Sequence, residues 1–281
     1  MNEYRPDNFK LKEGVYVPDT GIDYPVDDPY KGLVHYQKLR DLKFDDSYPY
    51  LDDSLGFKLQ WCIVNYFVVH FVLFLGNKIK YGMKFRGRDI LKKYKKEFKD
   101  GLMIISNHCY PWDGAAICQA LHHSLWIPML AEHFNGKEYW LLKHFGGIPV
   151  PDDFGGLKKF NEAFDEINAR KGWILVFPEA RNWRFYKPLK PFRKGAFTMA
   201  YKYKCPILPI NISYRERKGI YSLFGKKWEP LLELTIGEPI FPDGTKPRKS
   251  EVERLRVESH SRICEMGGIL ENPWPASWDE E

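Results

Sequence analysis

Cysteine is scarce in this chain, and its arrangement excludes the usual metal-binding and disulfide frameworks. The five cysteines, at positions 62, 109, 118, 205 and 264, contain no Cys-x-x-Cys pair and no zinc-ligand spacing. The histidines likewise lack the spacing of paired zinc ligands, so we expect no metal site. An odd, scattered set of cysteines is typical of a reduced, intracellular protein. The first residues also lack an apolar segment, and we therefore expect no cleavable signal peptide.

Charged residues are missing from one long segment. Between Lys58 and Lys78 the sequence contains no Asp, Glu, Lys or Arg, and most of its residues are large and apolar. At a rise of ~1.5 Å per residue, a helix of this length just crosses a hydrocarbon layer of ~30 Å. The alternative is a buried helix of a soluble protein, but apolar residues occur on all of its sides. We therefore expect a membrane helix at residues 55–77, which either spans the bilayer or lies in one leaflet.

The charges on the two sides of this segment differ in sign. Aspartates precede it, whereas the residues that follow it are crowded with cations: Lys78, Lys80, Lys84, Arg86, Arg88, Lys92, Lys93, Lys95, Lys96 and Lys99. By the positive-inside bias, we expect the domain after the helix on the cytoplasmic face of the membrane. The cluster also suits anionic lipid headgroups, and the formal net charge of +6 is compatible with lipid, an acidic carrier protein or nucleic acid.

The rest of the chain divides into an arm, a domain and a tail. Residues 1–54 are rich in Asp, Pro and Tyr without a sustained period, which predicts an irregular arm lying on another part of the protein. From Met83 onward, short apolar runs alternate with helical patterns. This rhythm favours an α/β domain with a mixed, largely parallel sheet flanked by helices. We assign residues 78–268 to this domain and residues 269–281 to a C-terminal tail.

The periodicity of the domain predicts four strands and four helices. The strands are expected near residues 102–106, 125–130, 173–177 and 206–214. The helices are expected near residues 113–121, 155–170, 194–203 and 250–266. The last helix is predicted to begin with Ser250 as its N-cap, because Glu253 follows three residues later, and to stop at Gly267-Gly268.

A histidine and an aspartate follow the first predicted strand of the domain. The segment Asn107-His108-Cys109-Tyr110-Pro111-Trp112-Asp113 leads into the next helix, since a proline and an acid suit a first helical turn. His108 then lies in the loop, and Asp113 can reach back to the imidazole. A carboxylate on one ring nitrogen leaves the other free to take a proton, which predicts a general base with its orienting partner. A capping aspartate beside a surface histidine is the alternative interpretation.

A second polar cluster follows the strand expected near residues 173–177. Glu179 stands at the end of this strand, and because ligands gather where parallel strands end, we expect it to approach His108. The loop behind it mixes aromatic residues and prolines with six cations: Arg181, Arg184, Lys187, Lys190, Arg193 and Lys194. Such a loop is suited to hold phosphate or to stack on RNA bases, although a solvated surface loop has the same composition.

Four segments resemble, in order, the motif blocks of the glycerolipid (PlsC-like) acyltransferases. These segments are Asn107–Asp113 with its His-x-x-x-x-Asp pattern, Gly146–Val150, Phe177–Glu179 followed by Lys194–Phe197, and Cys205–Ile210. A single block is weak support, but four in the family's order make the resemblance specific. It extends over roughly residues 80–240 of the chain.

The resemblance implies transfer of a fatty acyl group from a thioester to a lipid hydroxyl. The donor would be acyl-CoA or acyl-carrier protein, and the acceptor a lysophospholipid or a related lipid. His108 would take the hydroxyl proton while Asp113 holds the imidazole. The residues expected to contact substrate are Gly147, Glu179, Arg181, Arg184 and Lys194. No bound cofactor is expected, because the acyl donor is a co-substrate, and the expected partners are membrane lipids rather than nucleic acid.

The chain departs from the family pattern where the family binds the acceptor's phosphate. After Glu179 the family's Gly-Thr-Arg is replaced by Ala-Arg-Asn, and Asp152 stands where the second block usually has an arginine. Arg181 or Arg184 is a candidate substitute. A carboxylate at position 152, with Asp153 beside it, repels a phosphate monoester. We therefore expect an acceptor with a zwitterionic or neutral glycosylated headgroup.

Two other functions are compatible with the same residues. In the first, Cys109 is a nucleophile with a histidine base, as in a thioesterase or an amidase. Neighbours on an extended segment point apart, however, so Cys109 is expected to face the core. In the second, the protein is a non-catalytic binder of membranes or anionic ligands. A covalent acyl-enzyme would indicate the first function, and binding without thioester turnover would indicate the second.

Overall fold

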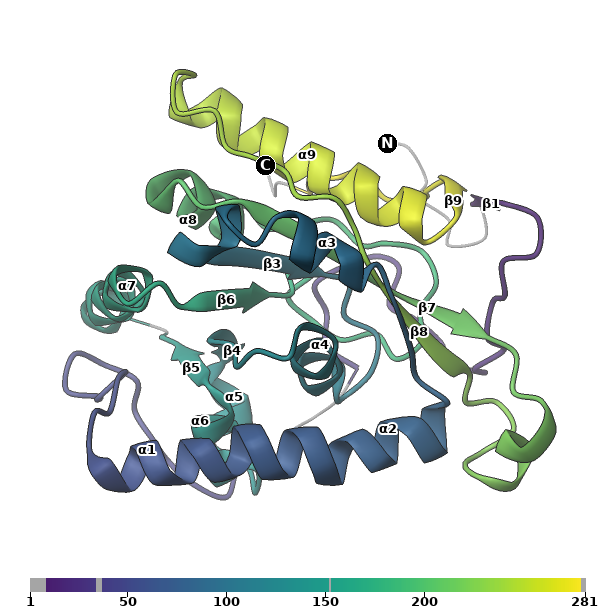
Figure 1. Ribbon diagram of the computed structural model, residues 1–281, viewed down its shortest axis with the longest axis horizontal. Coiled ribbons are helices and arrows are strands. Elements are labelled where there is room, and N and C mark those ends of the chain that lie inside the picture. The colour runs from purple at the N-terminus through teal and green to yellow at the C-terminus, as the bar shows by residue number, and fades with distance from the viewer. Residues whose placement is uncertain (1–8, 34–36, 152, 279–281) are drawn as a thin grey trace.

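The computed structural model of the chain describes residues 9–33, 37–151 and 153–278. At its centre is a sheet (Figure 1) with the strand order β2 (Lys84–Arg86), β8 (Leu231–Ile236), β7 (Ile207–Arg215), β3 (Leu102–Ser106) and β6 (Trp173–Val176). Strands β6, β3 and β7 are parallel, β8 is antiparallel to β7, and β2 is parallel to β8. The expected mixed, largely parallel sheet is therefore confirmed.

Two small sheets attach other segments to this centre. β4 (Ile127–Leu130) pairs in parallel with β5 (Gly147–Val150), so the strand expected near residues 125–130 forms outside the central sheet. β1 (Lys10–Leu11) pairs antiparallel with β9 (Ile269–Glu271). This pairing joins the beginning of the described chain to its C-terminal segment.

Helices cover both faces of the central sheet. α4 (Asp113–Leu121) and a long N-terminal helix pack on the face toward which Leu102 and Ile104 point. The alternate residues Met103 and Ile105 point to the other face, which is covered by α7 (Phe154–Ala169), α8 (Gly195–Tyr203) and α9 (Arg248–Met266). Every residue of β3 is buried, as expected for a strand covered on both faces. The shorter helices are α3 (Arg88–Lys93), α5 (Ala131–Phe134), α6 (Tyr139–Phe145) and the 3₁₀ segments η2 (Glu97–Asp100) and η3 (Gly219–Leu223).

The start of α9 corrects one prediction. The residue that precedes the helix is Pro247, so Ser250 lies inside the first turn and its hydroxyl donates to the Pro247 carbonyl at 2.9 Å. The prediction of Ser250 as the N-cap is therefore wrong. Proline holds φ near the helical value, here −56°, and this favours the earlier start. At the other end Gly267 caps the helix and Gly268 has φ +68°, which confirms the predicted stop.

A continuous helix from Leu55 to Tyr81 runs along one side of the domain (Figure 1). It consists of α1 (Leu55–Cys62), the π-helical segment η1 (Ile63–Val72) and α2 (Leu73–Tyr81). Ser54 caps its start by accepting the Phe57 N–H at 3.2 Å, and Gly82, with φ +50°, ends it. By length and composition it is a candidate membrane span.

Polar side chains of this helix point toward the domain. Asn65 Nδ2 donates to the His144 carbonyl at the end of α6 (2.9 Å), and Asn77 Nδ2 donates to Gln119 Oε1 on α4 (3.0 Å). Gln119 in turn donates to the Val69 carbonyl at 2.8 Å. The long helix is thus fastened to the domain along both of its halves.

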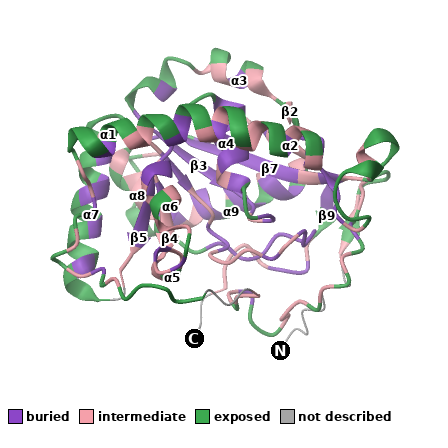
Figure 2. Ribbon diagram, turned by 90° about the horizontal axis from the view of Figure 1, so that it is seen from below, coloured by how far each residue is buried: buried purple, intermediate pink, exposed green. Residues whose placement is uncertain are grey.

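The outer face of the same helix is apolar. Figure 2, which views the protein from below, colours much of this helix as exposed. Its exposed large apolar residues are Leu55, Leu59, Ile63, Tyr66, Phe67, Phe71, Val72, Leu75 and Ile79. This distribution is the reverse of that on a surface helix of a soluble protein, which turns its polar side to water. A contiguous apolar face of this kind marks a surface that binds a membrane or another protein.

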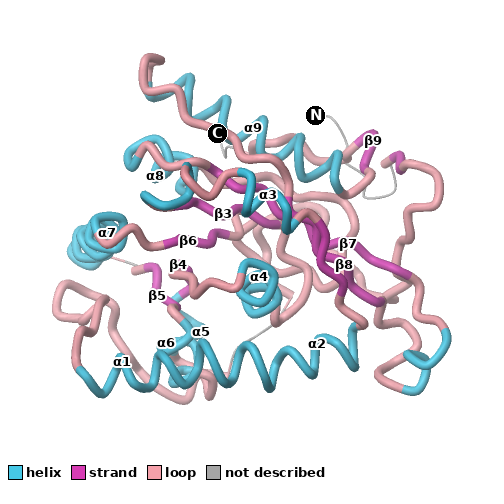
Figure 3. The backbone as a smooth tube through the Cα atoms, in the orientation of Figure 1, coloured by secondary structure: helices cyan, strands magenta, loops and turns pink. Residues whose placement is uncertain are grey.

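The N-terminal arm lies on the domain. Apart from β1, its described residues before Leu55 form no helix or strand (Figure 3). Phe44 and Tyr50 are buried, and Tyr50 packs edge-on against Phe160 of α7 at 6.2 Å between ring centroids. Tyr24 donates its hydroxyl to the Arg184 carbonyl at 2.7 Å, which holds the arm over the loop that follows β6.

Candidate active site

His108 and Asp113 face each other across the loop between β3 and α4. His108 Nδ1 lies 2.8 Å from Asp113 Oδ2. The same oxygen accepts the Cys109 N–H at 2.7 Å, and the Tyr110 N–H lies 3.2 Å from each carboxylate oxygen. The loop backbone therefore wraps around the carboxylate and fixes its position. Burial raises the pKa of Asp113, and the hydrogen bonds from His108 and the two N–H groups oppose this shift.

The second nitrogen of His108 remains available. When Nδ1–H donates to Asp113, Nε2 is the basic nitrogen of the ring. Nε2 makes no hydrogen bond to any residue that the structure describes, and the side chain is 19% exposed. The imidazole stacks on Phe177, at the end of β6, with 4.4 Å between ring centroids. The ring is thus held on one edge and one face, while the edge with Nε2 has no hydrogen-bond partner among the described residues.

Cys109 has the properties of a structural residue. Its side chain is buried, and its Sγ lies 3.7 Å from Asp113 Oδ1. Burial, with the negative charge of Asp113 as the second cause, raises the pKa of the thiol well above its usual value. A nucleophilic cysteine requires a lowered pKa and access to substrate. The geometry therefore does not favour the hydrolase mechanism that uses Cys109.

Glu179 lies beside His108 but contacts backbone groups. Its Oε1 accepts the His108 N–H at 2.8 Å, and its Oε2 accepts the Lys190 N–H at 3.2 Å. The carboxylate is buried, which raises its pKa, and the ammonium of Lys190 is the largest opposing influence. Glu179 therefore connects the His108 loop to the segment after β6. These contacts position the His108 loop, and the substrate contact expected of Glu179 from the sequence stays a prediction.

Lys190 is an internal cation. Its side chain is buried, and its Nζ donates to the carbonyls of Arg181 (2.7 Å), Pro29 (3.0 Å) and Glu179 (3.4 Å). Burial lowers the pKa of Lys190 to about 8. This cation ties the loop after β6 to the N-terminal arm and compensates the charge of Glu179.

The replacement Glu179→Gln is expected to lower the free energy of unfolding by about 3 kcal/mol or more, because it leaves the Lys190 ammonium buried without a carboxylate. Urea unfolding at neutral pH measures this change. The matched control is Glu162→Gln, which breaks the exposed Glu162–Lys159 pair (3.0 Å) and is expected to cost about 1 kcal/mol or less. In the double variant Glu179→Gln/Lys190→Met the loss should be smaller than the sum of the single losses. Strict additivity would show that the two charges do not interact.

The cationic loop after β6 is folded into the protein and is not a free basic surface. Arg181 forms an ion pair with Glu132 of α5. Arg184 pairs with the buried Glu229 at 2.6 Å, and Lys187 Nζ donates to the Gly267 carbonyl at 2.6 Å. Of the six cations of the loop, only Arg193 and Lys194 are exposed, so most of the loop is not a solvated surface. Its aromatic residues Trp183, Phe185 and Tyr186 are buried, so the interpretation as an RNA-stacking loop is wrong.

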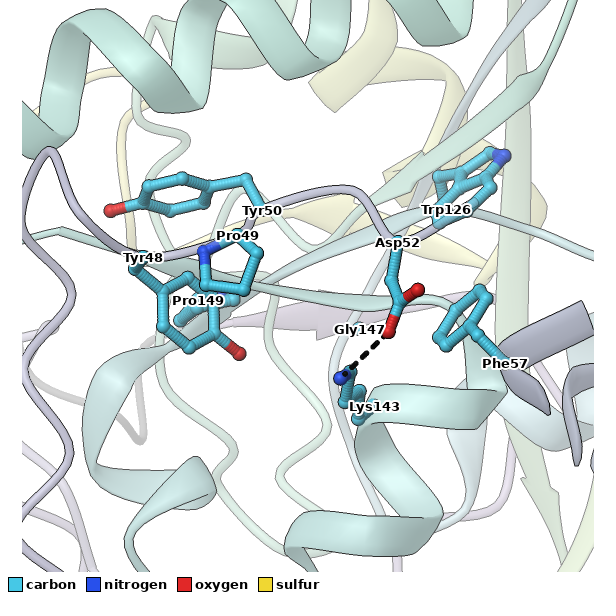
Figure 4. Close-up of a pocket in the computed structure, with 9 residues that line it drawn as sticks. All are labelled: Tyr48, Pro49, Tyr50, Asp52, Phe57, Trp126, Lys143, Gly147 and Pro149. Atoms are coloured by element: carbon cyan, nitrogen blue, oxygen red, sulfur yellow. Dashed lines mark hydrogen bonds and ion pairs between the residues drawn. The ribbon is translucent and has the colours of Figure 1, made fainter. Parts of the chain in front are cut away.

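Gly147 and Lys194, two other predicted substrate residues, make no hydrogen bond or ion pair with His108 in the described part of the chain. Gly147 begins β5, and a Cβ there would come within 2.7 Å of the Leu142 carbonyl, so close packing explains the glycine. Gly147 lines a cavity of about 10 Å³ (Figure 4), beside the Asp52–Lys143 ion pair at 3.3 Å. That volume holds about one water and no acyl chain. Lys194 is exposed just before α8 and makes no hydrogen bond or ion pair with His108 or Asp113.

Asn182 is a site residue that the sequence reasoning missed. Its Nδ2 lies 3.3 Å from His108 Nδ1, closer to the imidazole than either arginine expected there. The sequence did contain a signal for Asn182, because this residue occupies the position of the family's arginine in the third block. Ala180 likewise stands at the position of the family's glycine, and it holds a left-handed φ of +62°, which glycine adopts more easily.

The second-block acids have no demonstrated role at the site. Asp152 lies outside the described residues. Asp153 accepts the Gly156 N–H at 2.7 Å and caps the start of α7, so its carboxylate is already engaged. Within the ranges that the structure describes, no group of three or more His, Cys, Asp or Glu side chains is arranged to hold a metal ion.

Comparison with known proteins identifies one family and one similar structure. The sequence model of the Acyltransferase family matches residues 82–213, a segment that contains His108, Asp113 and Glu179. None of the curated proteins compared with the chain matches it significantly. Among solved structures, the chain is similar to the crystal structure of the 1-acyl-sn-glycerophosphate (LPA) acyltransferase PlsC from Thermotoga maritima. The identity is 18%, the match covers 80% of this chain and 98% of that one, and the TM-score is 0.46.

Proposed function

We propose that the chain is a membrane-associated O-acyltransferase, because residues 82–213 match the sequence model of the Acyltransferase family. It moves a fatty acyl group from acyl-CoA or acyl-carrier protein to a hydroxyl of a lysophospholipid or a related lipid. The observation that carries this proposal is the 2.8 Å contact between His108 Nδ1 and Asp113 Oδ2, which leaves Nε2 free as a base. A histidine held in this way matches the proton transfer that acylation of a hydroxyl requires.

The proposed reaction begins when Nε2 of His108 takes the proton of the acceptor hydroxyl. The oxygen attacks the thioester carbonyl, and the new carbon–oxygen bond gives a tetrahedral intermediate. Its collapse breaks the carbon–sulfur bond, and the departing thiolate receives the proton back from His108. Asp113 stabilises the imidazolium between these two transfers and holds the ring in the tautomer that the first transfer needs. The products are the ester and a free thiol.

The backbone N–H groups of His108, Cys109 and Tyr110 are not available to stabilise the oxyanion of the intermediate, so other donors must do so. The N–H of His108 donates to Glu179, and those of Cys109 and Tyr110 donate to Asp113. Those three donors are therefore already used in holding the base.

The membrane association is proposed to occur in one leaflet. The long helix is bonded to the domain through Asn65 in η1 and Asn77 in α2, and its outer face is apolar. A spanning orientation would draw the attached domain into the bilayer or break these bonds. An in-plane orientation buries only the outer face and brings the domain to the membrane surface. The cations after the helix suit the anionic cytoplasmic leaflet, which supports placement of the domain on that side.

The acceptor is proposed to lack a phosphate monoester. Arg181 and Arg184, the two candidates for a phosphate site, are each paired with a glutamate. Binding a phosphate with either arginine would first require an existing ion pair to break. An acceptor with a zwitterionic or neutral glycosylated headgroup needs no such exchange.

The acceptor class is tested by comparing kcat/KM for lysophosphatidate, lysophosphatidylethanolamine and a lysoglycolipid, each with acyl-CoA and with acyl-carrier protein as donor. Lysophosphatidylethanolamine or the lysoglycolipid is expected to have a higher kcat/KM than lysophosphatidate. The variant Arg181→Gln should leave the ratio unchanged, because that arginine already pairs with Glu132. A preference for lysophosphatidate of tenfold or more, about 1.4 kcal/mol, would contradict this assignment. Absence of thiol release with every pair would count against acyl transfer itself.

A further inference from the structure

A cationic cleft opens where the long helix ends and β2 begins. It has a volume of about 440 Å³ and is lined by Lys78, Lys84, Phe85, Arg86 and Arg88. Four of the five lining residues are cations, and none is an acid. The cleft contains no member of the His108 site. Its lining comes from the end of α2, from β2 and from the first residue of α3.

Three of the four cations have no carboxylate partner among the described residues. Arg86 pairs with Glu233 at 2.6 Å. Lys78 Nζ donates only to the Met83 carbonyl (2.8 Å), and Arg88 Nη2 donates only to the Gln119 carbonyl (2.8 Å). The side chain of Lys84, in contrast to its backbone in β2, makes neither a hydrogen bond nor an ion pair in the described part of the chain. The cleft therefore contains several positively charged side chains that have no carboxylate partner and can still donate hydrogen bonds.

The cations are held close together on a common surface. Lys78 Nζ lies 5.5 Å from the centre of the Phe85 ring, and Arg88 Cζ lies 4.6 Å from it. Burial lowers the pKa of Lys78, and the charges of Arg88, Arg215 and Lys84 lower it further. Like charges held together in this way repel one another, and an anion between them removes the repulsion. A phosphate group, with several acceptor oxygens, fits this arrangement of donors.

The position of the cleft indicates where such a phosphate comes from. Lys78 lies in the last turns of α2, between the exposed apolar residues Leu75 and Ile79. These residues belong to the outer apolar face of the long helix. The cleft therefore opens beside the part of the protein that enters a membrane, at the level where lipid headgroups lie.

We propose that the cleft formed by Lys78, Lys84 and Arg88 binds the phosphate of an anionic phospholipid headgroup and so orients the domain on the membrane. This inference rests on the membrane association proposed above and is independent of the acyl-transfer chemistry. It concerns a lipid of the surrounding bilayer, bound apart from the His108 site. The affinity for a membrane then depends on headgroup charge at this one position, in addition to the apolar face.

Vesicle flotation of the purified full-length chain tests the cleft. Wild type and Lys84→Gln/Arg88→Gln are compared on phosphatidylcholine vesicles and on vesicles containing phosphatidylglycerol. We expect the double variant to lose about tenfold or more of the preference for phosphatidylglycerol, since each cation at a membrane surface contributes substantially. The matched control is Lys92→Gln/Lys95→Gln, which removes two exposed cations of the neighbouring segment and should retain most of the preference.

Equal losses in the two double variants would overturn the proposal, because they would indicate diffuse attraction instead of a site. If Arg88→Gln lowers the melting temperature, the single variant Lys84→Gln replaces the double variant in the flotation assay, because Lys84 is exposed. It should lose about half as much of the preference for phosphatidylglycerol, on a logarithmic scale, as the double variant.

Inorganic phosphate, added at constant ionic strength, tests whether the cleft binds a soluble phosphate instead of a lipid headgroup. If it stabilises wild type but not the cleft variant, while both prefer phosphatidylglycerol equally, the cleft takes a soluble phosphate and the lipid assignment is wrong. His108→Ala should float like wild type, so a failure of catalysis leaves this test intact.

Discussion

His108→Ala is expected to lower acyl transfer by about 10²–10⁴-fold while the protein remains folded. The substitution removes Nε2, the nitrogen proposed to take the hydroxyl proton. His108 is at the edge of the core and partly exposed, so truncation should cost little stability. Release of free thiol from acyl-CoA in the presence of a lysolipid measures the rate. Near-normal turnover in a folded His108→Ala protein would exclude the proposed mechanism.

Two neighbouring substitutions make this test specific. Asp113→Asn should reduce the rate by an equal or smaller factor, since the amide keeps the shape of the carboxylate but not its charge toward the imidazolium. Cys109→Ala is the matched control, because Cys109 follows His108 directly and its thiol is buried. It is expected to keep most of the activity. Loss of activity in Cys109→Ala, together with a trapped acyl-enzyme in wild type, would instead support a cysteine hydrolase.

The second large effect concerns the apolar face of the long helix. The triple variant Leu59→Ser/Phe67→Ser/Phe71→Ser is expected to move the protein from the membrane to the soluble fraction. Each of these side chains is more than half exposed, so none supports the core. Removing one large apolar side chain from hydrocarbon costs about 1.5–3 kcal/mol, so three removals weaken membrane partitioning by about a thousandfold or more. Fractionation at low salt without detergent measures the change.

The control for this variant uses exposed apolar residues elsewhere. Phe154, Ile220 and Leu223 are also mostly exposed, but they lie on α7 and η3 and not on the long helix. Their replacement by serine should leave the protein in the membrane fraction. Equal behaviour of the two triple variants would mean that the long helix is not the membrane contact. Deleting the helix is a poorer experiment, because Val64 and Val69 are fully buried in the core.

The sequence by itself determined the parts of the protein that depend on short stretches of chain. The strand at residues 102–106 and the helix at residues 113–121 were predicted with their observed bounds. His108 and Asp113 are separated by only five positions, so the turn from strand to helix is enough to bring them together. The apolar strand β3 and the acid in the first turn of α4 specify that turn locally.

Contacts between strand ends were also predictable, although their chemical use was not. Glu179 follows a strand that is parallel to β3, and parallel strands end at the same edge of a sheet. This predicted its approach to His108. Only the tertiary structure decided that the carboxylate accepts the His108 backbone N–H, since that depends on the path of both loops.

The tertiary structure alone decided which charges and which faces are exposed. The loop with Arg181 and Arg184 has the composition of a solvated basic surface, yet Glu132 and Glu229, about fifty positions away from each, neutralise it. The long helix is apolar on all sides in sequence, and only its contacts through Asn65 and Asn77 distinguish an inner face from an outer one. Composition describes what a segment tends to do in water, whereas burial depends on partners distant in the chain. For that reason the contact between His108 and Asp113 could be predicted from the sequence, and the partners of the basic loop and the orientation of the helix could not.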